Sequence, residues 1–160
     1  MSPCDAASSA FTRMLHALDL RDWQTVRDSF ADQIDVDYSS LSGAPAAHVS
    51  GDEQIGGWRS FVGAFDATQH LTGPVIAVEG RDGELHASTH VRGYHRIAGA
   101  PGGDVWMVAG HYEVRLAHRR TKWRIVGLTL RVLYQEGNLD LPKQAQSRAA
   151  APQPIKASPA

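Results

Sequence analysis

The sequence has little cysteine, little excess charge of either sign and no long apolar run. Cys4 is the one cysteine in 160 residues, which excludes an internal disulfide and a cysteine-based metal site. The 16 basic and 17 acidic residues give a formal net charge of −1, so no basic surplus is available for nucleic-acid phosphates. No segment approaches the ~20 apolar residues of a membrane-spanning helix. We therefore expect neither nucleic acid nor a membrane as a partner.

The N-terminus lacks the charged start and apolar run of a secretory signal, so we expect a cytoplasmic protein. With 42% hydrophobic and 21% charged residues, the composition is typical of one globular domain with its own core. Beyond Asn138 the chain consists mainly of Ala, Pro, Gln, Ser and Lys. We therefore predict a folded domain over residues 1–141 and a disordered tail over residues 142–160.

The first part of the chain shows helical patterns. Apolar residues at i, i+3, i+4 and i+7 predict an amphipathic helix over residues 6–19, with Asp19 near its C-terminal end. The helix dipole disfavours a carboxylate there, so Asp19 lies in solvent or has a compensating partner. Asp22 can cap a second short helix, and Ser50 with Glu53 forms the capping box of a third.

Alternating residues predict strands. In residues 34–38 the alternation is strict and places Tyr38 on the core-facing side. After a loop and the third helix, the pattern is nearly all strand, in four segments with short connections: 70–79, 84–97, 105–118 and 122–134. Such an order predicts an α+β fold in which N-terminal helices pack on a curved, mainly antiparallel sheet and leave a pocket between them.

Four polar side chains interrupt the predicted inner surfaces. His70 lies where the third helix gives way to a strand, and His95 falls on the apolar side of strand 84–97. Tyr38 faces inward, and Asp19 is the acid that chain geometry places nearest the cavity. Several polar groups converging on one cavity would be costly unless paired. A satisfied structural network is one interpretation; we favour the other, a site for acid–base chemistry.

Metal and nucleotide sites are not predicted. On a strand, His86 and His90 would lie about 13 Å apart, too far to share an ion. The glycines at 56–57 and 99–103 lack the strand–loop–helix context of a phosphate-binding loop. We therefore expect no metal and no cofactor.

The sequence also carries a family likeness. It resembles the SnoaL-like branch of the nuclear-transport-factor-2-like superfamily, and within it scytalone dehydratase. The resemblance covers roughly residues 8–138 and rests on Asp19, Arg21-Asp22-Trp23, Asp37-Tyr38, Thr68-Gln69-His70, His95, Gly110-His111 and Trp123. It implies a cone-shaped α+β barrel around an apolar pocket.

The resemblance also implies site residues. His70 and His95 would be the catalytic histidines, Asp19 would orient His95, and Tyr38 would polarise the substrate carbonyl. We expect the substrate to contact apolar side chains from the helices, a loop and the last strand: Leu41, Trp58, Val62, Leu130 and Val132. Two features differ from the dehydratase, because Leu18 replaces a second tyrosine and strand 112–116 offers no asparagine.

These observations predict a cofactor-independent dehydratase. Its substrate would be a small hydrophobic β-hydroxy carbonyl compound, cyclic or aromatic, of secondary (for example polyketide) or degradative metabolism, which reacts through an enolate. The same pocket could serve an isomerase or a cyclase, or only bind a small molecule without turnover. The exposed face of the sheet leads us to expect a homo-oligomer, a dimer or trimer.

Overall fold

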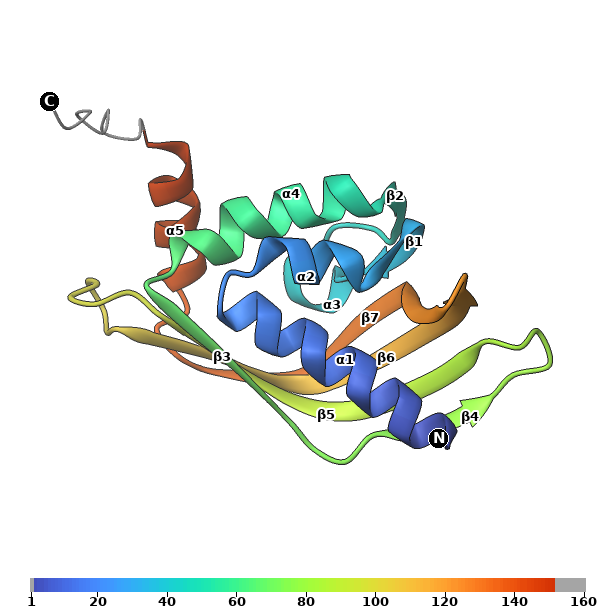
Figure 1. Ribbon diagram of the computed structural model, residues 1–160. Coiled ribbons are helices and arrows are strands. Elements are labelled where there is room, and N and C mark those ends of the chain that lie inside the picture. The colour runs from blue at the N-terminus through green and yellow to red at the C-terminus, as the bar shows by residue number, and fades with distance from the viewer. Residues whose placement is uncertain (1, 152–160) are drawn as a thin grey trace, which may run out of the picture.

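The computed structural model describes residues 2–151. Helices lie along one face of a curved sheet, and the last described helix stands beside α4 (Figure 1). The helices are α1 (Pro3–Asp19), α2 (Trp23–Asp28), α3 (Ser39–Ser42), α4 (Gly51–Phe61), the 3₁₀ turn η1 (Val62–Ala64) and α5 (Leu141–Ala150). The strands are β1 (Phe30–Asp37), β2 (Ala47–Ser50), β3 (Ala67–Thr72), β4 (Ile76–Glu79), β5 (Leu85–Arg96), β6 (Val105–Arg119) and β7 (Lys122–Gly137). Within this described part, no helix is both long and apolar enough to cross a membrane.

Local sequence explains the predicted helices. The side chain of Ser2 accepts the backbone N–H of Asp5, and the carboxylate of Asp5 accepts the backbone N–H of Ser2. Pro3 occupies the first turn of α1. One stripe of α1, Phe11, Met14, Leu15 and Leu18, is buried against the sheet. The predicted cap of α2 is also present, at Asp22; of the capping box predicted for α4, the Ser50 side chain accepts the backbone N–H of Glu53. This packing leaves Asp19 at the inner end of α1.

The sheet has the strand order β2-β1-β7-β6-β5-β3, with β4 also paired to β5. The predicted antiparallel meander is confirmed for β5, β6 and β7. Strand β1 adds to it by pairing in parallel with β7. The α+β fold with a curved sheet is therefore confirmed, although the sheet is open and does not close into a barrel.

Two predicted segments are corrected. The segment 70–79 forms two strands, β3 and β4, which pair with different parts of β5 and are separated at residues 73–75. Pro74 lies in this break, and proline has no N–H to donate to a ladder. The predicted loop 39–49 contains α3 and the edge strand β2.

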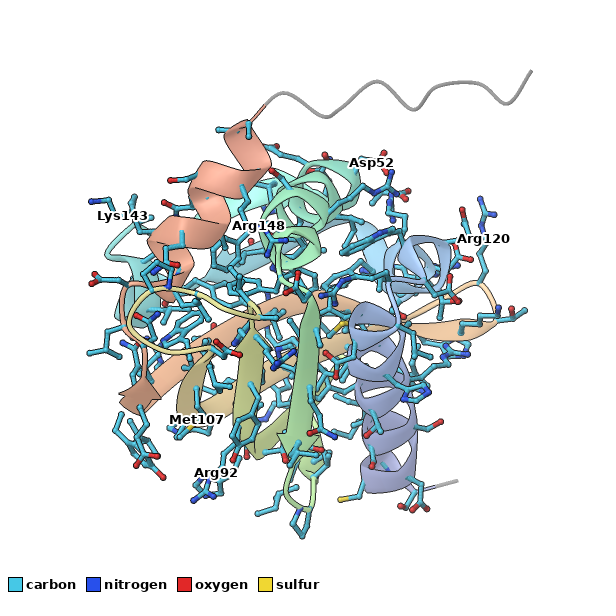
Figure 2. The ribbon with its side chains drawn as sticks, turned by 90° about the vertical axis from the view of Figure 1, so that its left-hand side faces the viewer. Asp52, Arg92, Met107, Arg120, Lys143 and Arg148 are labelled. Atoms are coloured by element: carbon cyan, nitrogen blue, oxygen red, sulfur yellow. The ribbon has the colours of Figure 1, made fainter. Side chains whose placement is uncertain are left out.

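The inner faces of the long strands form the core with α1. On β5 the predicted alternation is confirmed, with His95 among its buried residues. On β7 the pairing with β6 shifts between Arg115 and Leu116. Because of this irregularity Ile125 and Leu128 are both buried, although strict alternation would place them on opposite faces. Arg92 and Met107 project from the opposite face, away from the helices (Figure 2).

The disordered tail predicted over residues 142–160 is wrong for residues 142–150, which belong to α5; the part from 152 lies outside the described residues. Leu141 and Ala145 are completely buried, and Arg148 pairs with Asp66 at 2.9 Å (Figure 2). The two buried side chains are four residues apart and lie on one helical face, so the composition alone underestimated how much this segment buries.

Leu141→Ala should lower the free energy of unfolding by about 2–5 kcal/mol, because it leaves a cavity beneath α5. Urea unfolding measures the effect. Lys143→Ala on the same helix is the control, since Lys143 points into solvent (Figure 2) and its loss should change stability little. Equal small effects of the two substitutions would contradict the docking of α5.

Candidate functional site

A cavity of about 630 Å³ lies between the helices and the inner face of the sheet. His70, His95 and Tyr38 line it together, as the sequence predicted. Among its lining residues in the described chain there is no Asp, Glu, Lys or Arg. Five aromatic side chains contribute to its wall: Tyr38, Trp58, Phe61, Trp106 and Tyr112. This combination suits a neutral, flat ligand.

The outer face of the sheet carries a second hollow of about 750 Å³. Both aspartates that line it are already paired: Asp35 with Arg115, and Asp37 with Arg131 at 3.3 Å. It holds none of the predicted catalytic residues, and its ion pairs are exposed to solvent. The inner cavity is therefore the candidate site.

Asp19 contacts His70 twice. Its Oδ1 is 2.7 Å from Nδ1 of the His70 ring, and its Oδ2 accepts the backbone N–H of His70, also at 2.7 Å. Thr68 donates its hydroxyl to Oδ1 at 2.9 Å. Burial opposes ionisation of Asp19, but these hydrogen bonds outweigh it and lower the pKa of the carboxyl. The carboxylate holds the proton of His70 on Nδ1, which leaves Nε2 as the free basic nitrogen.

Arg21 stabilises the Asp19–His70 pair indirectly, through Thr68. Its Nη1 donates to the hydroxyl of Thr68 at 2.7 Å and to the carbonyl of Leu18 at 3.0 Å. The backbone of Arg21 has a φ of +61°, which turns the chain sharply at the end of α1. A guanidinium at this helix end offsets the unfavourable dipole that the sequence implied for Asp19.

His95 has a different environment. It is 6% exposed, packs against Trp106 with ring centroids 4.5 Å apart, and its Nδ1 has no hydrogen-bond partner in the described structure. Burial, and secondarily the charge of His70, lower its pKa to about 3. His95 is therefore neutral at neutral pH. The prediction that Asp19 orients His95 is wrong, since the carboxylate holds His70.

The rings of His70 and His95 can meet because Gly93, which lies between them on the sheet, has no side chain. Gly93 pairs with His70 across β3 and β5, and His95 lies two residues further on the same face. A Cβ on Gly93 would come within 3.2 Å of the His70 ring and 3.3 Å of the His95 ring. The absence of a side chain lets the rings meet edge to face, with centroids 5.6 Å apart.

Tyr38 faces a second phenol. Its hydroxyl is 3.3 Å from that of Tyr112 on β6, and the pair is braced by Trp58 and Phe11. Tyr38 itself follows β1 and precedes α3, so the strand ends one residue earlier than predicted, and it begins earlier too, at Phe30. Burial raises the pKa of both hydroxyls, that of Tyr38 strongly. Both stay protonated and can donate hydrogen bonds.

Comparison with protein-family models matches residues 5–129 to the SnoaL-like domain. The chain belongs to the SnoaL-like domain family. The resemblance inferred from the sequence is thereby confirmed. A search of curated proteins found no match.

Solved structures share the fold of this SnoaL-like domain. The Kfla4162 protein from Kribbella flavida is 26% identical, with a TM-score of 0.81 over 87% of this chain and 95% of that one. A Novosphingobium aromaticivorans protein provisionally named a scytalone dehydratase is 16% identical, with a TM-score of 0.68 over 83% and 85%. The hexachlorocyclohexane dehydrochlorinase LinA-type3 from Novosphingobium barchaimii is 12% identical, with a TM-score of 0.65 over 83% and 88%.

The predicted substrate-contacting residues can now be placed. Leu41, Trp58, Val62 and Leu130 line the cavity of the SnoaL-like domain. Val132 does not: it packs against the edge of the core, where its N–H bonds Ser40.

Tyr112 was missed by the sequence reasoning, although the signal was there. The alternation of β6 places it with the buried Val114 and Leu116. The sequence interpretation considered only the missing asparagine in 112–116 and gave the phenol of Tyr112 no role.

The grouping nearest to a metal site in the described residues lies elsewhere. Donor atoms of Asp82, Glu84 and His86 come within 4.8 Å of one another at the turn before β5. Glu84 already pairs with Arg115 at 3.1 Å, and none of the three lines the inner cavity. The catalytic candidates do not depend on this cluster.

The depressed pKa of His95 makes stability depend on pH. The unfolded chain binds a proton at this histidine below about pH 6.5, whereas the folded state does so only near a pKa of about 3. Stability is therefore highest above pH ~6.5 and decreases as the pH falls towards the folded pKa. At pH 5 the contribution of His95 is a loss of about 2 kcal/mol relative to pH 8.

Urea unfolding at pH 5 and pH 8 measures this loss. His95→Leu should reduce the difference between the two pH values by about 2 kcal/mol. His90→Leu, on the exposed face of the same strand, should leave it unchanged. A wild-type difference that survives His95→Leu would show that His95 is not held neutral.

Proposed function

We propose that this SnoaL-like protein is a cofactor-independent lyase that removes water from a small, neutral, cyclic or aromatic β-hydroxy carbonyl compound. The observation that carries the proposal is one arrangement: His70, which Asp19 holds through its Nδ1, shares an aromatic cavity with two protonated phenols. A base beside donors for an oxyanion is what enolate chemistry requires. Two structural neighbours are named for eliminations, a dehydratase and a dehydrochlorinase, and this supports the same reaction class.

His70 acts as the base in the first step. Its free Nε2 takes a proton from the carbon next to the carbonyl, and Asp19 stabilises the imidazolium that forms. The electron pair moves onto the carbonyl oxygen, which receives hydrogen bonds from Tyr38 and Tyr112. The product of this step is an enolate.

The second step expels the β-hydroxyl. As the enolate collapses to the conjugated carbonyl, the carbon–oxygen bond breaks and the leaving oxygen takes the proton held by His70. Water is released and His70 is again a base, so the cycle balances without an added reagent. His95, neutral because of its depressed pKa of about 3, serves as a hydrogen-bonding group and not as the proton donor.

The test uses 3-hydroxy-1-tetralone, a bicyclic β-hydroxy ketone that gives 1-naphthol when it loses water and aromatises. The purified protein, treated with EDTA, should form 1-naphthol faster than buffer alone, followed by mass spectrometry. A product of unchanged mass would replace the dehydratase with an isomerase. Saturable binding of this and related β-hydroxy ketones without product would overturn the enzymatic proposal in favour of a binding module.

A further inference from the structure

The cavity has a second polar region, distinct from the acid–base groups. Tyr112 and His95 are buried and lie at the inner end of the cavity. Exposed neutral side chains mark its outer rim: Ser42, Gln135 and Gln146. They come from α3, β7 and α5, none of which carries Asp19, His70 or His95. The rim can therefore contact a part of the ligand that does not react.

Gln135 differs from the other rim residues because its amide is oriented. The indole N–H of Trp106 donates to Oε1 of Gln135 at 2.8 Å. An indole nitrogen is only a donor, so the amide oxygen must face it and the Nε2 group must face away. That Nε2 makes no hydrogen bond to any residue the structure describes, which leaves its two N–H groups available at the cavity rim.

The anchor of Gln135 is rigid. Trp106 is 2% exposed and packs against the rings of His95 and Phe65, with centroids 4.5 Å and 6.3 Å away. Gln135 pairs across the strands with Val108, and its side chain reaches diagonally to Trp106. The rim donor is thus fixed by the same indole that packs on the catalytic histidine, and little side-chain freedom is lost when a ligand binds.

We propose that Gln135 is a specificity residue whose Nε2 donates to a second carbonyl oxygen, at the outer end of the ligand. The substrate class is then a flat, neutral aromatic compound with two carbonyl groups. One faces the Tyr38–Tyr112 pair and the other faces Gln135. The identity of the inner, reacting carbonyl rests on the proposed function, whereas the outer subsite rests on Gln135 and Trp106 alone.

The experiment measures binding and needs no turnover. Two probes differ by one carbonyl group: 2-acetylnaphthalene and 2,6-diacetylnaphthalene. The wild-type protein should bind the diketone about three- to tenfold more tightly, the value of one hydrogen bond at an exposed rim. Isothermal titration calorimetry gives both dissociation constants.

Gln135→Glu is the decisive variant because it changes the donor while keeping the anchor. The carboxylate still accepts from the Trp106 indole, but an acceptor now faces the cavity. The diketone should lose its advantage, and 6-acetyl-2-naphthol, which presents an O–H at that end, should become the tighter ligand. Gln135→Leu should abolish the advantage without favouring the naphthol.

Gln33→Glu adds the same charge at an exposed position of β1 that does not line the cavity, so it should keep the preference for the diketone. The inference is overturned if wild type binds both ketones equally, or if Gln135→Glu retains the preference. Absence of dehydration together with a Gln135-dependent preference would refute the proposed function and leave this subsite standing. Dehydration without the preference would support the proposed function and refute the outer subsite.

Discussion

His70→Asn should lower kcat by about 10²–10⁴-fold, the usual contribution of a positioned general base. The asparagine amide can place an N–H where Nδ1 of His70 stands, so the hydrogen bond to Asp19 survives and the cavity keeps its shape. What is lost is Nε2, the nitrogen that takes the proton. Turnover of 3-hydroxy-1-tetralone under saturating conditions measures the effect, with a thermal unfolding curve to show that the variant is folded.

Asp19 acts through His70, so the two substitutions should not add. Asp19→Asn removes the charge that fixes the tautomer of His70 and stabilises its imidazolium. In the double variant the cost should be little more than that of His70→Asn alone, because nothing remains to be oriented. Asp22→Asn is the matched control, since Asp22 only caps α2 and should leave kcat unchanged. Additive losses would mean that Asp19 works independently of His70.

Much of the fold could be predicted because its signals are local. The alternation in 84–97 placed His95 inward, and the capping residues Ser50 and Asp22 fixed two helix starts. The parallel pairing of β1 with β7 could not be predicted, because it joins residues about a hundred positions apart in sequence with no turn to set the register. Helix α5 was missed since its buried face consists of little more than Leu141 and Ala145.

The site could be predicted as a set of residues but not as a set of contacts. Sequence periodicity places His70 and His95 inward, yet which of them meets Asp19 depends on how β3 registers on β5. The observed register sets His70 opposite Gly93 and Thr68 opposite His95. His70 therefore lies against the end of α1, and His95 lies against Trp106. Asp19 and His70 therefore form a charge-stabilised pair, whereas the His95 ring is neutral. This difference depends on how deeply each ring is buried, which sequence periodicity does not predict.

The phenol pair gives the second large effect. In the proposed mechanism two hydroxyls share the developing negative charge, so either Tyr38→Phe or Tyr112→Phe alone leaves one donor in place. Each should lower kcat by about 10²-fold, within the range for one lost oxyanion donor, while the dissociation constant for 2-acetylnaphthalene changes little. The aromatic ring, which supplies the packing, is retained in both.

The double variant Tyr38→Phe/Tyr112→Phe distinguishes two roles for Tyr112: a second hydrogen-bond donor to the oxyanion, or a group that only orients Tyr38. If both hydroxyls contact the oxyanion, removing the second donor should cost a further about 10²-fold in kcat. If Tyr112 only orients Tyr38 through the 3.3 Å hydroxyl contact, the double variant should equal Tyr38→Phe, as expected of residues that act in series. Since the raised pKa keeps each phenol protonated, neither loss should depend on pH between about 6 and 9. Full turnover in the double variant would remove the phenols from the mechanism and leave the enolate without its donors.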